Sequence, residues 1–120
     1  MKVLVADDSR VMRQIVMRTL RQAGYGHVDV VEAANGAEGL ALCADEQPDL
    51  VLSDWNMPEM TGIEFLRSLR SQGDDRPFGF VTSEGSPAMR DTAAEAGAIF
   101  LIAKPFNADT FRDALEPVLG

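Results

Sequence analysis

Four short apolar runs in this sequence each end in polar residues suited to holding a phosphate group. The runs at 3–6, 50–53, 80–81 and 99–103 lead, in that order, into these residues: Asp7 and Asp8, Asp54, Thr82 with Ser83, and Lys104. If the runs are neighbouring parallel strands, three carboxylates, a hydroxyl and an ammonium group converge on one edge of a sheet. In open α/β sheets the carboxyl edge of the strands is where ligands bind. The search for function therefore begins at this edge.

The alternation of apolar runs and amphipathic segments predicts an α/β fold. Short runs rich in β-forming residues lie at 2–6, 28–32, 50–53, 78–82 and 99–103. Amphipathic segments of about 10 to 15 residues separate them, a rhythm typical of repeated βαβ units. We therefore expect a doubly wound, five-stranded parallel sheet flanked by five helices, the last beginning at Asn107.

Start and stop signals mark the predicted helices. Asn35 and Thr61 each stand three residues before a glutamate, the pattern of a capping box with a return hydrogen bond. Ser86 is followed by a proline, which is favoured at the first helical position. Gly24 and Gly97 stand where a helix must end in a left-handed residue.

Length and composition narrow the class of protein. The 120 residues are expected to form one domain, 1–120, that buries roughly two thirds of its unfolded surface. The net charge of −8 argues against direct binding of nucleic acid, which requires a basic face. No apolar stretch approaches the about 20 residues that span a bilayer. The single cysteine, Cys43, cannot form an internal disulfide, so a cytoplasmic location is expected.

The acidic residues have a structural explanation as well as a functional one. Asp8 or Ser9 can cap the first helix, and Asp54 can be an ordinary loop residue. Gathered at one edge, however, carboxylates about 4 Å apart repel by roughly 4 kcal/mol at an effective dielectric constant near 20. A divalent cation and a fixed positive side chain relieve that repulsion. Carboxylate oxygens suit Mg²⁺, and Lys104 can supply the remaining charge.

The charges of such a site point to phosphoryl transfer. Three carboxylates, one Mg²⁺ and the Lys104 ammonium sum to zero, so the site can accept a phosphoryl group without large repulsion. Catalysis of phosphoryl transfer consists mainly of positioning and charge neutralisation. A carboxylate can itself be the nucleophile and form an aspartyl phosphate. We expect Asp54 to take this part, because it follows an interior strand, and Thr82 to donate to a phosphoryl oxygen.

The same residues, in this order, resemble the receiver domain of two-component response regulators. The resemblance covers the whole chain and rests on four motifs: Val3-Leu-Val-Ala-Asp-Asp-Ser9, Asp54-Trp-Asn-Met-Pro-Glu-Met-Thr-Gly62, Val81-Thr-Ser83 and Ala103-Lys-Pro-Phe106. The Asp54-Trp55-Asn56 tripeptide and the lack of an output segment look most like the stand-alone chemotaxis regulators. The resemblance implies the flavodoxin-like strand order 2-1-3-4-5.

The resemblance also assigns roles. It implies that a histidine kinase or phosphotransfer protein donates its phosphohistidine phosphoryl group to Asp54. Mg²⁺ is then held by the side chains of Asp8 and Asp54 and by the backbone carbonyl of Asn56, with Asp7 acting mainly through water. Lys104 and Thr82 contact the phosphoryl group.

Three further features are implied by the same family. The Lys104–Pro105 peptide is expected to be cis. Asn56 and Glu84 occupy positions that tune the loss of phosphate, so self-catalysed dephosphorylation is expected. A downstream protein is expected to read the switch on the face made by the fourth helix, fifth strand and fifth helix. Apart from these family features, the chain is expected to act as a monomer.

One position departs from the family pattern. An aromatic residue often stands three positions before the strand-end lysine and turns inward when the switch threonine moves; here that residue is Leu101. Its neighbour Phe100 cannot substitute, because adjacent strand residues face opposite sides of a sheet. The usual aromatic readout is therefore in doubt.

Other functions remain open at this level. A Mg²⁺-dependent phosphatase would use an aspartyl phosphate too, but a second acid two residues after Asp54 is missing. A flavin- or nucleotide-binding module would require a glycine-rich or hydroxyl-rich loop after the first strand, where two acids stand instead. The expected protein is accordingly a phosphorylation switch that acts on no separate metabolite.

Gly79 and Trp55 allow two readings each, and Cys43 has one simple explanation. Gly79 indicates either close approach of another group or a locally weak strand. Trp55 is either a packing residue or an exposed residue at the rim of the site. Cys43 is most simply explained as small core filler.

Overall fold

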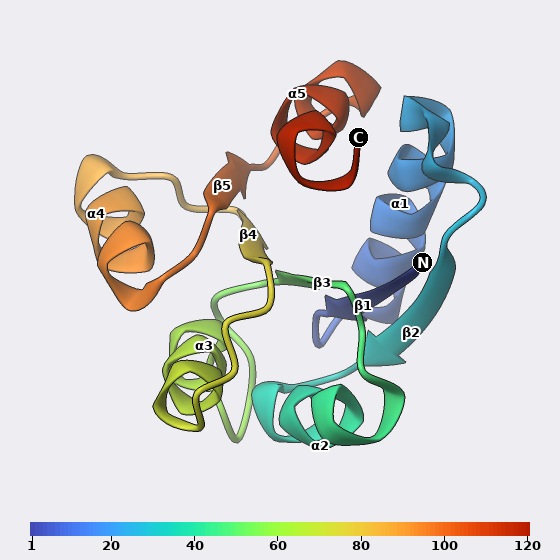
Figure 1. The fold of residues 1–120 in the computed structure, drawn as a ribbon. Helices are drawn as coiled ribbons and strands as arrows, with labels where there is room; N and C mark the ends of the chain where they lie inside the picture. Colours follow the sequence, from blue (N-terminus) through green and yellow to red (C-terminus); the bar gives the residue numbers. More distant parts are fainter.

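The computed structural model describes residues 1–120 as one sheet between two layers of helices (Figure 1). The five strands are β1 Lys2–Ala6, β2 Asp29–Ala33, β3 Leu50–Ser53, β4 Phe78–Thr82 and β5 Phe100–Ala103. The five helices are α1 Arg10–Leu20, α2 Gly36–Glu46, α3 Gly62–Ser71, α4 Pro87–Ala96 and α5 Ala108–Leu119. The α/β fold predicted from the alternating runs is confirmed.

The strands pair in parallel in the order β2-β1-β3-β4-β5. This order, implied by the family resemblance, is also confirmed. Two predicted strand starts are early by one residue, since β2 begins at Asp29 and β5 at Phe100. Val28 belongs to the preceding turn, where its amide donates to the Tyr25 carbonyl at 3.3 Å.

Each face of the sheet has its own apolar core. Helices α1 and α5 cover one face, and α2, α3 and α4 cover the other (Figure 1). On the first face, Val16 and Leu20 of α1 meet Phe111 and Leu115 of α5. The second face is filled largely by α3 and by aromatic rings of β4: Phe65, Leu66, Leu69, Phe78 and Phe80. The two cores explain why the strands are apolar on both sides.

Every helix begins at a capping side chain that accepts a backbone N–H from three residues further on. The caps are Ser9, Asn35, Thr61, Ser86 and Asn107. The complete capping box forms only at Thr61, where Glu64 returns the bond at 2.9 Å. At Asn35 the return bond predicted for Glu38 is missing; that carboxylate is exposed, and water competes for it.

Two glycines adopt the left-handed conformation predicted for them. Gly97 ends α4 with φ of 103°. Gly24, with φ of 99°, lies within a single wide turn, Arg21–Tyr25, that follows α1 directly. At both positions a side chain would strain the backbone.

Gly79 is required by close approach and does not merely weaken its strand. It pairs with Phe100 on the neighbouring strand, and a Cβ at Gly79 would overlap the Phe100 ring. Phe100 packs with the core under α1 and α5, whereas Leu101 packs with the core on the other face. The aromatic ring is thus on the wrong side of the sheet to replace Leu101, as expected.

Cys43 is fully buried between α2 and the sheet, with 1% of its surface exposed, so its assignment to the core is confirmed. Burial raises the pKa of its thiol to about 11. Elsewhere, no helix combines the length and apolar character needed to cross a membrane.

Candidate functional site

The carboxyl edge of the sheet gathers the side chains that the sequence singled out. Asp7 follows β1, Asp54 follows β3, and Thr82 is the last residue of β4. Lys104 follows β5, where its amide donates to the Thr82 carbonyl at 2.8 Å. The strand order therefore brings together residues that lie up to 97 positions apart in the sequence.

Three carboxylates form a compact acidic group. One oxygen from each of Asp7, Asp8 and Asp54 lies within 4.8 Å of the others. Asp7 is buried, Asp54 is half-buried and Asp8 is exposed, so the group opens to solvent on the Asp8 side. Such a spacing lets all three oxygens face one cation.

Lys104 is the one cationic side chain that forms ion pairs with these carboxylates. Its Nζ is 3.5 Å from Asp7 Oδ2 and 3.9 Å from Asp54 Oδ2. One ammonium offsets only part of three negative charges, so the cluster keeps a net attraction for a second cation. The ammonium is a compact charge that can also turn toward an incoming anion.

The Asp7 carboxyl has a raised pKa. Burial raises its pKa, and the nearby charge of Asp54 raises it further. A hydrogen bond from the Ser9 amide and the charge of Lys104 act in the opposite direction without cancelling the shift. Arg13, which was not among the predicted site residues, donates to the Asp7 carbonyl at 2.6 Å and fixes the end of β1. No sequence pattern distinguishes Arg13 from the other arginines of that helix.

The hydroxyl of Thr82 has no hydrogen-bond partner. The residue is 0% exposed, and its Oγ1 is the single buried side-chain oxygen or nitrogen of the chain without a hydrogen-bond partner. Leaving a buried hydroxyl unpaired costs about 1–3 kcal/mol. A group of this kind at the edge of an acidic cluster is poised to donate to an additional ligand.

The turn after β3 shapes the other wall of the site. Asp54 Oδ1 accepts the Trp55 amide at 2.8 Å, and the Trp55 ring packs on Phe80 with centroids 4.7 Å apart. Trp55 is thus a half-buried packing residue. Gly62 at the start of α3 lies so close to the Asp54 carbonyl that a Cβ would overlap it.

The residues expected to modulate the site lie around its rim. Asn56 is exposed in the turn after Asp54, and Glu84 is exposed two residues beyond Thr82. Leu101 is half-buried on the α4 side of β5. The Lys104–Pro105 peptide is cis, as the family resemblance implies.

The donor set fits a hard divalent cation. All three acidic side chains offer oxygen atoms, which Mg²⁺ prefers, and no cysteine thiol or imidazole group belongs to the cluster. The opening beside Asp8 leaves room for the waters that Mg²⁺ usually keeps.

The fold and the residues at its carboxyl edge together indicate a class of protein, and comparison with known proteins gives the same class. Residues 3–116 match the response regulator receiver domain family, and the chain belongs to that family.

Several relatives are similar over the full length. The chain is 42% identical to a chemotaxis protein CheY homolog of Campylobacter jejuni, covering 100% of this chain and 93% of the relative. It is 41% identical to chemotaxis protein CheY1 of Helicobacter pylori, covering 100% and 98%. The structure of CheY4 from Vibrio cholerae aligns with a TM-score of 0.85 at 41% identity, covering 98% of each chain. The receiver domain of a NarL response regulator from Mycobacterium tuberculosis aligns with a TM-score of 0.85 at 30% identity, covering 97% and 93%.

Proposed function

We propose that residues 1–120 act as one phosphorylation-switched receiver unit. A histidine kinase or phosphotransfer protein supplies the phosphoryl group as phosphohistidine. The bond from phosphorus to the imidazole nitrogen breaks, a bond to an Asp54 carboxylate oxygen forms, and the imidazole regains a proton from solvent. The observation that carries the proposal is the meeting of three carboxylates, Lys104 and an unpaired Thr82 hydroxyl at one edge.

Mg²⁺ is the proposed cofactor. Asp7, Asp8 and Asp54 are the candidate side chains for holding it, together with the Asn56 backbone carbonyl. When bound, the ion supplies positive charge that neutralises phosphoryl oxygens. The support for this step is the acidic cluster itself, with its oxygen-only donor set.

Lys104 and Thr82 are proposed to act on the phosphoryl group once it is attached. The Lys104 ammonium, now 3.9 Å from Asp54 Oδ2, would pair with a phosphoryl oxygen. The Thr82 hydroxyl would rotate to donate to another oxygen and thereby gain the partner it lacks. This gain favours a new position for the residues that follow β4.

The output of the switch is proposed to be a changed affinity for a downstream protein on the face of α4, β5 and α5. Because several relatives are named as chemotaxis proteins, we propose a chemotaxis-type pathway. Leu101 stands on this face without an aromatic ring, so its role there must differ from an aromatic readout.

Loss of the phosphoryl group is proposed to be catalysed by the protein itself. Asn56 and Glu84 are exposed at the rim of the site, where they can position an attacking water. No separate metabolite is turned over, so the protein is a signalling switch and not an enzyme in the usual sense.

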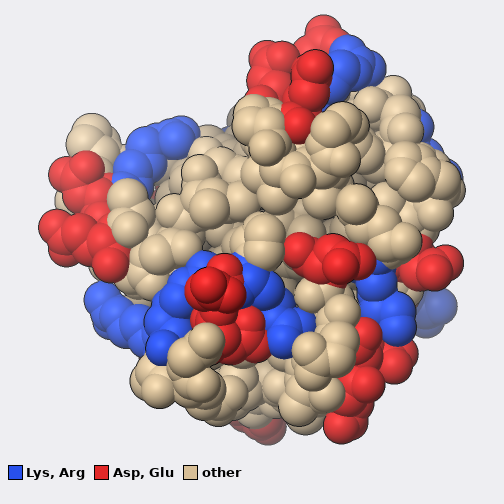
Figure 2. Space-filling model, viewed as in Figure 1, with Lys and Arg blue, Asp and Glu red and all other residues tan.

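The remaining parts of the proposal concern binding partners, cellular location and oligomeric state. The net charge of −8 supports the absence of direct nucleic-acid binding, and on one face acidic and basic groups alternate in small patches (Figure 2). The free, buried Cys43 is consistent with a proposed cytoplasmic location. We also propose that the chain acts as a monomer without inserting into a membrane.

Intact mass spectrometry tests the core of this proposal. Incubation with Mg²⁺ and acetyl phosphate is expected to add one phosphoryl group. Asp54→Asn or removal of Mg²⁺ should abolish the gain, whereas the control Asp75→Asn, an exposed acid remote from the site, should keep it. A mass gain that persists in Asp54→Asn would contradict the assignment. Steady hydrolysis of a small phosphate ester would instead favour a phosphatase.

A further inference from the structure

One arginine links the loop after Thr82 to the edge strand of the sheet. Arg90, in the first turns of α4, donates from Nε to the Gly85 carbonyl at 3.2 Å and from Nη1 to the Leu101 carbonyl at 3.0 Å. Gly85 lies three residues beyond Thr82, and Leu101 is on β5. The guanidinium group thus bridges two segments that the proposed switch must move relative to each other.

The loop at Gly85 is closely confined. A Cβ at Gly85 would lie 3.0 Å from the Ala103 Cβ and 3.2 Å from Arg90 Nη2. The segment therefore sits between β5 on one side and the guanidinium on the other. A shift of this loop has to break at least one of the two Arg90 hydrogen bonds, because the planar fork of arginine has fixed geometry.

Helix α4 depends on such polar contacts more than the other helices do. Ala93 is its single buried residue, whereas α3 buries five. At the far end of α4, Arg70 donates to the Gly97 carbonyl at 2.7 Å. With so little apolar surface buried, the position of α4 is set largely by arginines that hold backbone carbonyls near its two ends.

We propose that Arg90 is a positioning residue that stabilises the unphosphorylated arrangement of the loop after β4. The inference rests on the proposed phosphorylation switch. It adds that the Arg90 hydrogen bonds oppose the loop movement that phosphorylation causes. In this arrangement the Thr82 hydroxyl has no partner, and the Arg90 bonds offset that cost. Besides the direct bond from the Lys104 amide to the Thr82 carbonyl, the two Arg90 hydrogen bonds provide a side-chain link between the loop after Thr82 and β5, where Leu101 offers no aromatic ring.

Removing the Arg90 contacts should change the equilibrium between the unphosphorylated and phosphorylated states. A contact present only in the unphosphorylated state opposes phosphorylation, so its removal shifts the population toward the phosphorylated arrangement. Arg90→Met keeps the apolar stem and loses both hydrogen bonds. We expect the acetyl phosphate concentration for half-maximal phosphorylation to fall about fivefold, the low end of usual coupling, because Arg90 is exposed.

The experiment is a titration of each Mg²⁺-loaded variant with acetyl phosphate. The phosphorylated fraction is read by intact mass and by the fluorescence of Trp55, the one tryptophan, which adjoins Asp54. Arg90→Lys, whose single ammonium cannot bridge both carbonyls in the same geometry, is expected to fall between wild type and Arg90→Met. Arg67→Met is the matched control, because Arg67 is exposed on α3 and makes no hydrogen bond or ion pair.

Hydrogen exchange distinguishes this role from a merely structural one. In unphosphorylated Arg90→Met, the amides of residues 89 and 90, which donate to Ser86 at the end of the loop, should exchange as fast as in phosphorylated wild type. Faster exchange with an unchanged half-maximal concentration overturns the inference, because Arg90 would then stabilise both states equally. A rise in that concentration overturns it too. Failure of wild type itself to be phosphorylated would instead refute the proposed function.

Discussion

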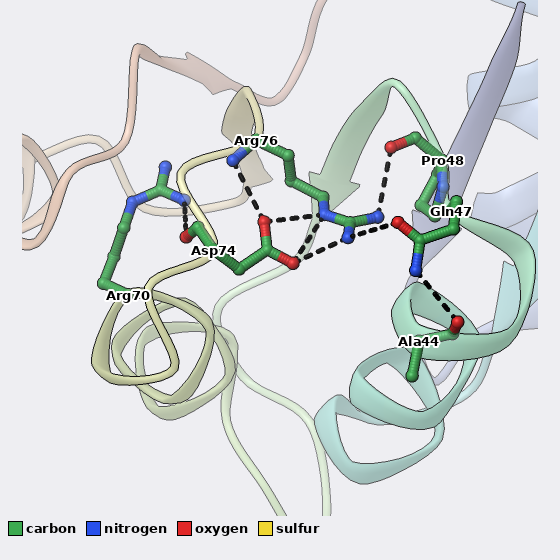
Figure 3. A network of polar contacts seen from close by, with 6 residues as sticks. All are labelled: Ala44, Gln47, Pro48, Arg70, Asp74 and Arg76. Carbon is green, nitrogen blue, oxygen red and sulfur yellow. Dashed lines mark hydrogen bonds and ion pairs between the residues drawn. The ribbon is translucent and has the colours of Figure 1, made fainter.

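The two edges of the sheet differ in how completely their polar groups are paired. At the carboxyl edge, three carboxylates share one lysine, and the Thr82 hydroxyl has no partner. At the amino edge, Asp74 and Arg76 form an ion pair of 2.6 Å with further Nε bonds of 2.9 Å to both carboxylate oxygens (Figure 3). Arg76 also donates to the Pro48 carbonyl at 3.1 Å and the Gln47 side chain at 3.4 Å.

A second arginine extends the amino-edge network. Arg70 donates to the carbonyls of Asp74 and Gly97, at 2.9 and 2.7 Å. The two arginines thereby connect the loops after α2 and α3 (Figure 3), and Arg70 also reaches Gly97 at the end of α4. Arginine is well placed there, because the carbonyls at helix C-termini lack intrahelical partners and carry partial negative charge.

This difference suggests that the amino edge stabilises the fold, whereas the carboxyl edge is suited to binding a ligand. A network whose donors and acceptors are all paired contributes to stability and has no capacity left for a ligand. A cluster with excess charge and an unpaired donor loses stability and is ready to bind. Four predictions test this division, beginning with the largest expected change.

The largest effect should come from a divalent cation at the carboxyl edge. At about 100 times its dissociation constant, Mg²⁺ should raise the free energy of unfolding by about 2.7 kcal/mol. Urea denaturation with and without Mg²⁺ measures the gain. Asp54→Asn should lose most of it and Asp75→Asn none; equal gains in both would show that the cation binds elsewhere.

The amino edge should respond most to loss of its central arginine. Arg76→Met removes the side-chain partners of the Asp74 carboxylate, which then keeps only the backbone amide of residue 76, and it removes the donor to the Pro48 carbonyl. Stability should fall by about 2 kcal/mol. The figure is below that for a buried pair, because both side chains are partly exposed. Urea denaturation checks it against Arg67→Met, which should change stability by less than about 0.5 kcal/mol. A small effect of Arg76→Met would mean that the network contributes little.

The unpaired hydroxyl gives a prediction of opposite sign. Thr82→Val replaces the orphan hydroxyl with a methyl group of similar shape, and should raise stability by about 1 kcal/mol. Thr19→Val is the matched control, because the buried Thr19 hydroxyl already donates to the Ile15 carbonyl at 2.8 Å and should show no gain. Thermal and urea unfolding compare the two. An equal gain in both variants would show that the missing partner is not the cause.

The smallest expected effect is on the loss of stability at low pH. Hydrogen bonds from Arg76 hold the pKa of Asp74 below its usual value of 3.8. The stabilisation is therefore fully present above about pH 4 and is lost as pH falls through the lower folded-state pKa. Between pH 6 and pH 3, wild type should lose more stability than Asp74→Asn. Asp75→Asn should follow wild type, and equal losses in all three proteins would remove Asp74 as the source.

Local sequence patterns predicted most of the fold, because each depends on neighbouring residues. The five runs, the caps at Thr61 and Ser86 and the left-handed glycines are all set within a few positions. The missing return bond at Asn35 was not foreseen, since competition from water depends on exposure. Gly79 became interpretable only once β5 was placed beside β4, with Phe100 opposite it.

That the strand-end side chains lie together was predictable from the sequence, whereas their hydrogen bonding was not. The strand-end positions of Asp7, Asp54 and Lys104 indicate that they meet. That Thr82 lacks a partner, or that Arg90 spans Gly85 and Leu101, depends on side-chain directions across distant segments. The same holds for the amino-edge network, whose residues 74–77 look in the sequence like an ordinary polar turn.

The buried cysteine provides a chemical reporter of how the α2 layer opens. Cys43 is the chain's one thiol, and its pKa of about 11 leaves almost no thiolate at neutral pH while the protein is folded. Alkylation at that position therefore counts molecules in which α2 has lifted from the sheet or the whole chain has unfolded. An added surface cysteine on α4 can accordingly be labelled selectively without first removing the natural one.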